Sequence, residues 1–318
     1  MHWIAKLRAV LWNVYGECEN YAVLAGHKNA ILQLRWGNNS RHIVTACADK
    51  TVGLWDVDSA TKLRTWKSHS SIVNCVDATV SGPSMAVSGS DDGTVRLWDS
   101  RQRGSVHSHS VSVDGSVPTP LPITAVAFAE GGSTDMLYFG GVAGDVVQYD
   151  VRAGKERMTL TGHDAVITGL SVSAEHQLVA SHGSDGTVRL WDSRPFAGDA
   201  STSILGGNAA AAPAETHPRQ RALLSRTAHS AQRVLHRVAL SPDASRVAAG
   251  SADEMLYIWH TTPDAEAKRD AVGRDARLQY ALPGHTGAVT EVAWSPIEPI
   301  VASCGLDGKV YLGELKQA

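Results

Sequence analysis

The chain has 318 residues, of which 43% are hydrophobic and 19% are charged, and this balance excludes wholesale disorder. No stretch approaches ~18 consecutive apolar residues, so we expect no transmembrane helix. The formal charge of −3 argues against bulk binding of nucleic acid. The four cysteines have no C-x-x-C spacing, which predicts reduced structural thiols rather than a zinc site or a redox pair.

One short pattern recurs along the chain and ends in a tryptophan followed by an aspartate. It is complete at residues 51–56, 94–99 and 187–192, where it reads Thr-Val-x-Leu-Trp-Asp. Weaker copies end at Trp12-Asn13, Tyr149-Asp150, Trp259-His260 and Gly313-Glu314. The copies follow one another at a period of roughly 43 residues, with three longer intervals, and such a period is typical of a WD-repeat β-propeller.

Each regular unit begins with a histidine and continues with segments of alternating apolar residues. In chain order, the histidine pairs are Gly26-His27, Ser68-His69, Gly162-His163 and Gly284-His285. First strands are predicted at 31–36, 73–78, 167–172 and 289–294, and second strands at 43–46, 85–88, 178–181 and 300–303. Tight turns at Asp49-Lys50, Asp92-Gly93, Asp185-Gly186 and Asp307-Gly308 then lead into the strand that carries the tryptophan. Because one four-stranded sheet cannot bury both of its faces, we expect the sheets to stack as blades.

We therefore predict an all-β WD-repeat propeller that occupies residues 1–318 as a single domain. It has the seven-bladed ring of its family, with a first blade that is incomplete at the N-terminus. The first residue of the tryptophan type is Trp12, and a histidine at the usual spacing of ~28 residues would precede Met1. An alternative stays open, in which residues 21–24 form the outer strand of the last unit and close a ring of six blades.

Three insertions interrupt the period, at about 103–122, 197–232 and 262–277. The first two are rich in small and polar residues, which predicts mobile loops. The third is charged and rich in alanine, and its composition is compatible with a short surface helix that begins at Thr262-Pro263. We expect His107 and His109, which lie in the first insertion, to be solvated rather than to bind a metal.

The repeat fixes a set of four residues in each complete unit, which we call a polar tetrad. The three complete tetrads are His27, Thr45, Asp49 and Trp55; His69, Ser88, Asp92 and Trp98; and His163, Ser181, Asp185 and Trp191. Ser, His and Asp together have the chemistry of a hydrolytic triad. Catalysis needs one such set in one pocket, however, whereas this set recurs in unit after unit. We predict a structural cluster, in which the aspartate bonds to the histidine, the histidine to the hydroxyl, and the hydroxyl to the indole N–H.

The other units depart from the tetrad pattern. The unit of Tyr149 has Ala143 where the aspartate is expected, and the unit of Trp259 keeps Asp253 but has Ala249 at the position of the hydroxyl. The last unit keeps His285, Ser303 and Asp307 and has Gly313 in place of the tryptophan.

Several segments depart from a generic WD repeat in the same way as one known family. They are residues 11–21, 89–95, 192–196 and 248–253, and the ending from Leu282 to Glu314. These segments resemble the WD-repeat subunits of the U-five small nuclear ribonucleoprotein, and the irregular positions Trp12-Asn13, Arg194-Pro195-Phe196 and Gly313-Glu314 carry the finer assignment. The resemblance implies a non-enzymatic scaffold of the spliceosome in the nucleus. Its implied partners are the large pre-mRNA-processing scaffold protein and other ribonucleoprotein subunits.

A second hypothesis concerns arginines that follow the Trp-Asp pairs. Arg101 and Arg194 complete a Trp-Asp-x-Arg motif, and Arg152 completes the variant Tyr-Asp-x-Arg. Such motifs resemble those with which substrate receptors of cullin-type ubiquitin ligases dock on an adaptor protein. The simpler interpretation is that each arginine pairs with a neighbouring carboxylate or contacts solvent.

An enzyme on a propeller is the third hypothesis, and the sequence gives it no support. It contains no G-x-G-x-x-G, no G-x-x-x-x-G-K-[ST] and no HExxH. We therefore expect no catalytic residue, no metal, no cofactor, no small-molecule substrate and no membrane partner. RNA contact is expected to be weak at most, through arginines of the second insertion, Arg219, Arg221 and Arg226.

Overall fold

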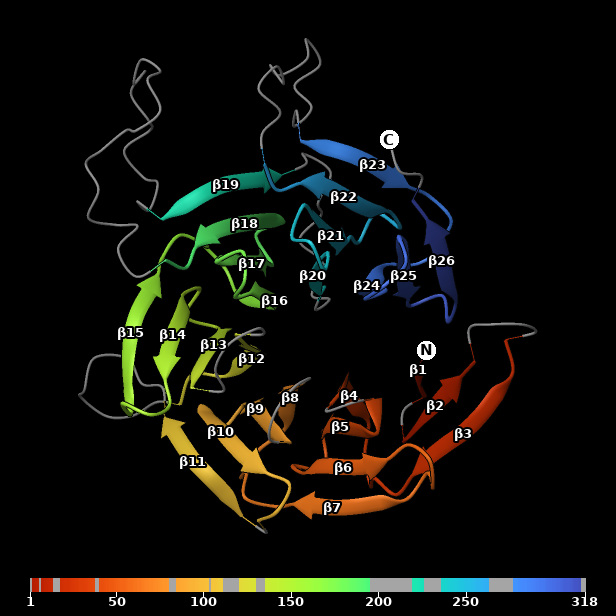
Figure 1. Cartoon of the computed structure of the whole chain (residues 1–318), viewed down its shortest axis with the longest axis vertical. Helices are drawn as coiled ribbons and strands as arrows, with labels where there is room; N and C mark the ends of the chain where they lie inside the picture. The colour runs from red at the N-terminus through yellow and green to blue at the C-terminus, as the bar shows by residue number, and fades with distance from the viewer. Residues whose placement is uncertain are drawn as a thin grey trace. The chain divides into compact units, whose positions relative to one another are not determined.

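The structure is a computed structural model of the chain. It describes residues 2–5, 7–13, 18–37, 40–79, 84–102, 104–110, 120–129, 135–194, 219–225, 236–262 and 277–315. All regular elements longer than one turn in these ranges are β-strands (Figure 1). No helix of the described ranges is long and apolar enough to cross a membrane.

The strands form antiparallel sheets within two compact units, the first comprising Met1–Val142 and Val147–Arg157. The first unit begins with a three-stranded sheet of β1 (His2–Ala5), β2 (Arg8–Trp12) and β3 (Asn20–Ala25). Two four-stranded sheets follow, β4 (Ile31–Trp36), β5 (His42–Cys47), β6 (Val52–Asp56) and β7 (Lys62–Trp66), then β8 (Val73–Ala78), β9 (Met85–Ser90), β10 (Thr94–Asp99) and β11 (Ser105–Ser110). The next sheet, which continues into the second unit, consists of β12 (Ile123–Phe128), β13 (Met136–Gly141), β14 (Val146–Asp150) and β15 (Lys155–Leu160).

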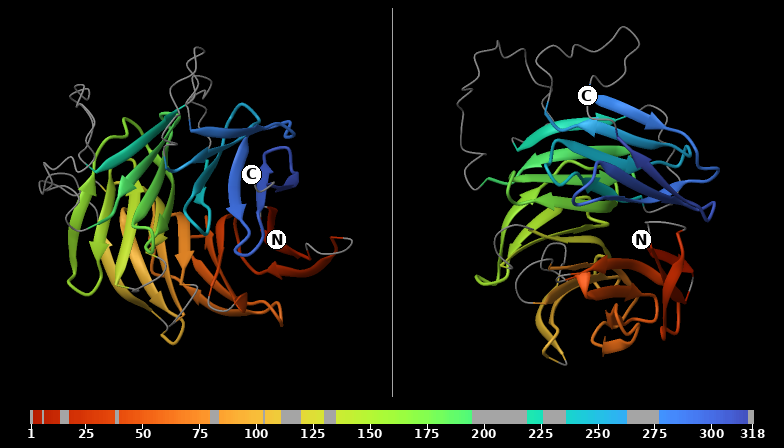
Figure 2. Two further views of the ribbon diagram at one scale, coloured as in Figure 1. Left: turned by 45° about the horizontal axis from the view of Figure 1, so that its top comes forward. Right: turned by 45° about the vertical axis from the view of Figure 1, so that its right-hand side comes forward.

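The second unit comprises Ala143–Val146 and Met158–Ala318. Its first complete sheet consists of β16 (Ile167–Ser173), β17 (Leu178–Gly183), β18 (Thr187–Asp192) and β19 (Gln220–Ser225), whose strands lie side by side in both views of Figure 2. The next sheet consists of β20 (Val238–Leu240), β21 (Arg246–Gly250), β22 (Leu256–His260) and β23 (Leu278–Leu282). The last has three strands, β24 (Val289–Trp294), β25 (Ile300–Gly305) and β26 (Val310–Glu314).

The predicted turns before the tryptophan strands are present, and each needs a residue with positive φ. Gly93, Gly186 and Gly308 adopt φ of 71°, 76° and 72°, and Lys50 adopts 68° at the same position in the first complete sheet. Glycine has no Cβ and takes this conformation without strain, whereas lysine takes it at some cost. The aspartate before each of these residues compensates, because its Oδ1 accepts the backbone N–H two residues on, as Asp49 does from Thr51 at 3.0 Å.

Within each unit the core lies between neighbouring sheets. In the first unit, Trp66 of β7 stacks on Trp98 of β10 with ring centroids 5.3 Å apart, and both are buried. In the second unit, Trp259 of β22 packs in one apolar cluster with Leu190 of β18. Four-stranded antiparallel meanders that pack face to face in chain order are propeller blades. The predicted all-β propeller class is therefore confirmed.

The described residues form seven sheets, and the first is short of one strand, as the interrupted repeat predicts. Residues 21–24 belong to β3, which pairs with β2 from Arg8↔Ala25 to Trp12↔Asn20; the six-blade alternative stays a prediction. Closure of the ring and the single domain stay predictions.

Two predicted loops contain a strand. Residues 105–110 form β11 and residues 220–225 form β19, so the insertions predicted at 103–122 and 197–232 are corrected at these places. Both strands are outer strands paired on one edge, and β11 has only small and polar residues besides Val106, so its apolar signal is weak. The predicted mobility of 103–122 and 197–232 otherwise concerns residues largely outside the described ranges. The helix predicted at 262–277 lies outside them apart from its two end residues.

Candidate functional site

The structure brings the four members of each polar tetrad together on one sheet. In the sheet of β4–β7, His27 Nδ1 lies 3.0 Å from Asp49 Oδ2 and His27 Nε2 lies 2.7 Å from Thr45 Oγ1. The indole of Trp55 donates to the same hydroxyl oxygen at 2.9 Å. His27, Thr45 and Trp55 are buried, so the chain of bonds runs inward from the turn to the core.

The other two complete tetrads repeat this geometry. The bonds from His69 to Asp92 and Ser88 are 2.9 and 2.8 Å, and Trp98 donates to Ser88 Oγ at 2.8 Å. In the second unit, His163, Asp185, Ser181 and Trp191 make the same three bonds, all of 2.8 Å. The structural role predicted for these clusters rests on this geometry.

The last sheet has the same polar bonds without a tryptophan. His285 Nε2 bonds to Ser303 Oγ at 2.9 Å and its Nδ1 lies 3.1 Å from Asp307 Oδ2. The ring of Tyr311 meets His285 edge to face, with centroids 4.6 Å apart.

Electrostatics assign the protons within the tetrads. Burial raises the pKa of Asp49, but hydrogen bonds from Thr51, Lys28 N–H and His27 outweigh it, and its pKa lies well below the usual range. Burial likewise raises the pKa of Asp92 and of Asp185. Hydrogen bonds, led by those from the histidine and the threonine, outweigh it, and both pKa values lie well below the usual range. An ionised aspartate only accepts, so the histidine donates from Nδ1, accepts at Nε2 from the hydroxyl, and the hydroxyl oxygen accepts the indole N–H.

This arrangement favours a structural cluster over a catalytic triad. A hydrolytic serine has to reach a substrate carbonyl, whereas Ser88 and Ser181 are fully buried and accept a bond from tryptophan. The same set recurs in both units, which one active site does not require.

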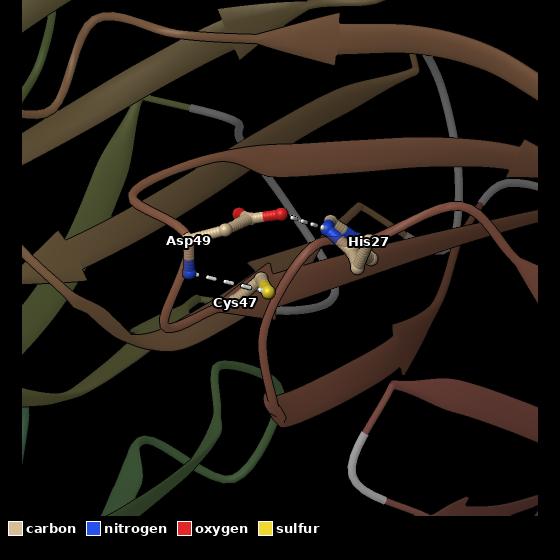
Figure 3. Close-up of side chains that lie close together, drawn as sticks. All are labelled: His27, Cys47 and Asp49. Carbon is tan, nitrogen blue, oxygen red and sulfur yellow. Dashed lines mark hydrogen bonds and ion pairs between the residues drawn. The ribbon is translucent and has the colours of Figure 1, made fainter.

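A group with metal-ligand chemistry lies in the first tetrad (Figure 3). Ligand atoms of His27, Cys47 and Asp49 lie within 4.8 Å of one another. Cys47 Sγ is 3.2 Å from Asn29 O and accepts the N–H of Asp49 at 3.4 Å, and burial raises its pKa to about 11. Ser90 Oγ makes the corresponding bonds in the next sheet, to Ile72 O and from Asp92 N–H. The protonated thiol of Cys47 thus makes the two hydrogen bonds that the Ser90 hydroxyl makes in the next sheet. The three residues therefore do not indicate a metal site.

Sequence reasoning missed two sets of residues that support the turns. One is the residue two places before the aspartate, Cys47 or Ser90. The other is the threonine that opens the repeated motif: Thr51, Thr94 and Thr187 donate from Oγ1 to the aspartate Oδ1 at 2.5, 2.6 and 2.8 Å. The constant threonine was the signal for the second set, but its position at a strand start concealed its role.

In the irregular units the aromatic side chains have other hydrogen-bond partners than in the tetrads. Tyr149, which replaces the tryptophan, is buried, and its hydroxyl bonds at 2.7 Å to His107 Nε2 from β11 of the neighbouring sheet. His109 packs on the same ring at 4.5 Å and pairs with Glu156 at 3.0 Å. The solvated loop expected for these histidines is therefore corrected, because both lie in a strand and contact the next sheet. In β22, Tyr257 donates to Asp253 at 2.5 Å.

The three candidate docking arginines differ in their contacts. Arg101 is 76% exposed and binds Asp99, with its Nε 3.0 Å from Oδ1 and its Nη2 2.7 Å from Oδ2. Arg194 binds Asp192 in the same way, its Nε 2.9 Å from Oδ2. Arg152 is exposed, and Asp150 accepts a bond from Arg157 instead, at 2.7 Å. Docking through these arginines stays a prediction.

Among the described residues no cysteine forms a disulfide; Cys18 is exposed, Cys47 and Cys75 are buried and Cys304 is partly exposed. Burial raises the pKa of Cys304 to about 12.

The family model that matches this chain matches it in segments that contain strands of these sheets. The family model of the WD domain, G-beta repeat, matches residues 18–56, 60–99, 154–192, 221–260 and 276–312. The chain belongs to the WD40 repeat family. The matches leave out 100–153, the region of Tyr149 and Ala143, whose sheet has lost the tetrad.

Several curated proteins align with almost the whole WD40 chain. The U5 small nuclear ribonucleoprotein 40 kDa protein of Dictyostelium discoideum is 36% identical over 307 residues, which cover 96% of this chain and 75% of that protein. The human protein of the same name is 35% identical over 308 residues, with the same coverages. Pre-mRNA-splicing factor cwf17 of Schizosaccharomyces pombe is 33% identical over 306 residues, 96% of this chain and 78% of that protein. This similarity places the chain in their family, as the resemblance of its irregular positions predicted.

Proposed function

We propose that this protein is a non-enzymatic protein-interaction scaffold of the spliceosome that acts in pre-mRNA splicing as a component of the U5 small nuclear ribonucleoprotein. The observation that carries the proposal is the similarity along 96% of the chain to proteins named for that particle and for splicing. A nuclear location and contacts with other ribonucleoprotein subunits follow from it.

The architecture supports a scaffold. Stacked sheets with satisfied buried polar groups make a rigid support, and loops at the sheet ends remain available for partners. The Ser, His and Asp side chains of the tetrads are engaged in structural bonds, which is the reason for proposing a protein without catalytic activity.

Affinity purification tests the proposal. The tagged protein is recovered from a nuclear extract of its own organism, and bound proteins and RNA are identified by mass spectrometry and sequencing. We expect U5 ribonucleoprotein subunits, with U5 RNA recovered through them. Recovery of a ubiquitin-ligase adaptor without spliceosomal proteins would overturn the proposal and favour the receptor hypothesis.

One double arginine variant separates these outcomes further. Arg101→Ala together with Arg152→Ala removes two of the arginines on which adaptor docking depends. A scaffold of the spliceosome keeps its ribonucleoprotein partners in this variant, whereas a ligase receptor loses its adaptor.

A further inference from the structure

Arginines gather at the end of β18 in the second unit around one carboxylate. Asp192 accepts bonds from Nε and Nη2 of Arg194 and from Nε and Nη2 of Arg221, with Arg221 Nη2 at 2.7 Å. Arg219 donates to the backbone carbonyl of Arg194, and its own carbonyl accepts the N–H of Asp192 at 2.9 Å. We call Arg194, Arg219 and Arg221 the arginine cluster.

The arginine cluster carries more positive charge than its carboxylate can balance. Burial raises the pKa of Asp192, but the bonds from Arg194 and Arg221 outweigh this and bring it to about 2, so the carboxylate is ionised at neutral pH. The guanidinium groups of Arg194 and Arg221 thus flank one negative charge. Asp192 is 6% exposed, while the side chains of Arg194 and Arg221 are 56% and 39% exposed. The anion is therefore on the inside and the cations face outward.

Each guanidinium keeps the capacity to bind a further acceptor. Arginine has five N–H donors, and two nitrogens of Arg194 and two of Arg221 bond to Asp192. These bonds also fix the orientation of both groups. A second anion that binds here meets donors that are already ordered, which lowers the entropy cost of binding.

A β-bulge recurs in the outer strands, and the residues that it carries set this sheet apart from the others. The pairing of β18 with β19 shifts between Leu190 and Trp191, so Arg221 is the extra residue of the outer strand. Bulges re-aim side chains. At the same bulge the outer strands β3, β7, β11 and β23 carry Tyr21, Leu63, Val106 and Gln279. Two residues earlier they carry Glu19, Thr61, Gly104 and Arg277. Of these five outer strands, β19 alone has arginine at both positions.

We propose that the arginine cluster is a docking site for a phosphorylated serine or threonine of a protein partner. The inference rests on the proposed function as a protein-interaction scaffold and names a chemistry for one of its contacts. A phosphate monoester carries a charge of about −2 near neutral pH and three acceptor oxygens. Planar guanidinium groups bind such an anion with paired hydrogen bonds.

The compactness of the cluster favours a single phosphate over a nucleic-acid backbone. Binding of a nucleic-acid strand neutralises several phosphates in a row with cations spaced along it, whereas these arginines lie around one aspartate at one strand end. The whole chain also has a formal charge of −3, which repels a polyanion.

Direct binding to the purified full chain tests the proposal. The probes are a fluorescent pool of short random-sequence peptides with a fixed central phosphoserine and its unphosphorylated twin, followed by fluorescence anisotropy. The variant is Arg219→Gln with Arg221→Gln. Arg101→Gln is the control. Arg101 binds Asp99, two residues before it, as Arg194 binds Asp192, but the outer strand of its sheet carries Val106 at the bulge.

We expect the phosphorylated pool to bind about tenfold or more tightly than its twin, and the double variant to lose this preference. The control keeps it. Melting curves verify that both variants fold; should the double variant unfold, Arg221→Gln alone replaces it. Equal binding of the two pools, or the same loss in the control, overturns the proposal. A short oligouridine RNA that binds more tightly than the peptides, and loses binding in the double variant, assigns the cluster to RNA instead.

The two proposals fail separately. If spliceosomal proteins are recovered in the purification but the peptide pools bind equally, the phosphate site is wrong and the scaffold stands. If the phosphorylated pool binds but spliceosomal proteins are absent, the partner belongs to another assembly.

Discussion

A buried histidine is stable in these sheets because both of its ring nitrogens have partners. His163 bonds to Asp185 on one side and to Ser181 on the other, and the serine oxygen then accepts the N–H of Trp191. Each such bond adds about 0.5–1.5 kcal/mol net, but an unpaired buried group costs about 1–3 kcal/mol. The tetrad is therefore sensitive to the loss of any one member.

Replacement of Asp185 tests this at a single residue. Asp185→Ala removes the carboxylate that accepts from His163 Nδ1, leaving Thr187 Oγ1 at 3.3 Å, and removes the bonds that Thr187 donates to that carboxylate. We expect a loss of about 1–3 kcal/mol in the free energy of unfolding. Urea unfolding of the variant measures the loss, with Asp164→Ala, an exposed neighbour, as control. Equal stability of the two variants contradicts the structural role, as does a hydrolytic activity that Asp185→Ala alone abolishes.

The tetrads could be read from the sequence because their members keep a constant spacing within one repeat. His107 and Tyr149 could not, since they lie on different sheets and no other unit repeats their distance along the chain. The arginine cluster was hidden for a related reason. Arg221 reaches Asp192 only because a bulge displaces it, and the sequence of 197–232 gives no sign of a strand register.

At the scale of the elements, the outer strand β11 substitutes for a missing tetrad. It presents His107 to Tyr149, so the bond that would lie within one sheet links two neighbouring sheets of the first unit. A contact of this kind couples the stability of the two sheets. Because the strand is short and polar, its sequence resembled a loop.

A double-mutant cycle measures this coupling. His107→Ala leaves the buried Tyr149 hydroxyl unpaired and should destabilise the protein by about 1–3 kcal/mol. Tyr149→Phe removes the hydroxyl as well, so the two changes together should cost less than the sum of the single changes. Urea unfolding of the four proteins gives the coupling energy, and Ser108→Ala, on the exposed side of β11, is the control. Additive effects contradict the link.

For the whole molecule, buried histidines and ionised aspartates make stability depend on pH. Burial lowers the pKa of His27 and of His236, so below about pH 6.5 the unfolded chain takes up protons that the folded chain does not. Stability from these histidines is present above that pH and is lost as the pH falls. The aspartates act lower, since Asp307 has a pKa of about 2 against about 3.9 when unfolded.

We therefore expect two steps of destabilisation on acidification. The first lies between about pH 7 and 5 and belongs to His27 and His236, and the second lies between about pH 4 and 2 and belongs to the aspartates. Urea midpoints at a series of pH values and constant ionic strength measure both. A midpoint that stays constant from pH 7 to pH 3 contradicts the lowered pKa values of these histidines and aspartates.

The reactivity of the buried thiols can report on the unfolding of each unit. Cys47 and Cys75 belong to the first unit and Cys304 to the second, and Cys18 is open to solvent. A thiol that is buried or whose pKa is raised reacts slowly with alkylating reagents until its surroundings open. Alkylation at increasing urea concentrations, followed by peptide mass spectrometry, gives the urea concentration at which each unit unfolds. The exposed Cys18 serves as the reference for full labelling. Simultaneous labelling of Cys47 and Cys304 is expected of one cooperative domain, and labelling at separate urea concentrations would mean that the two halves melt independently.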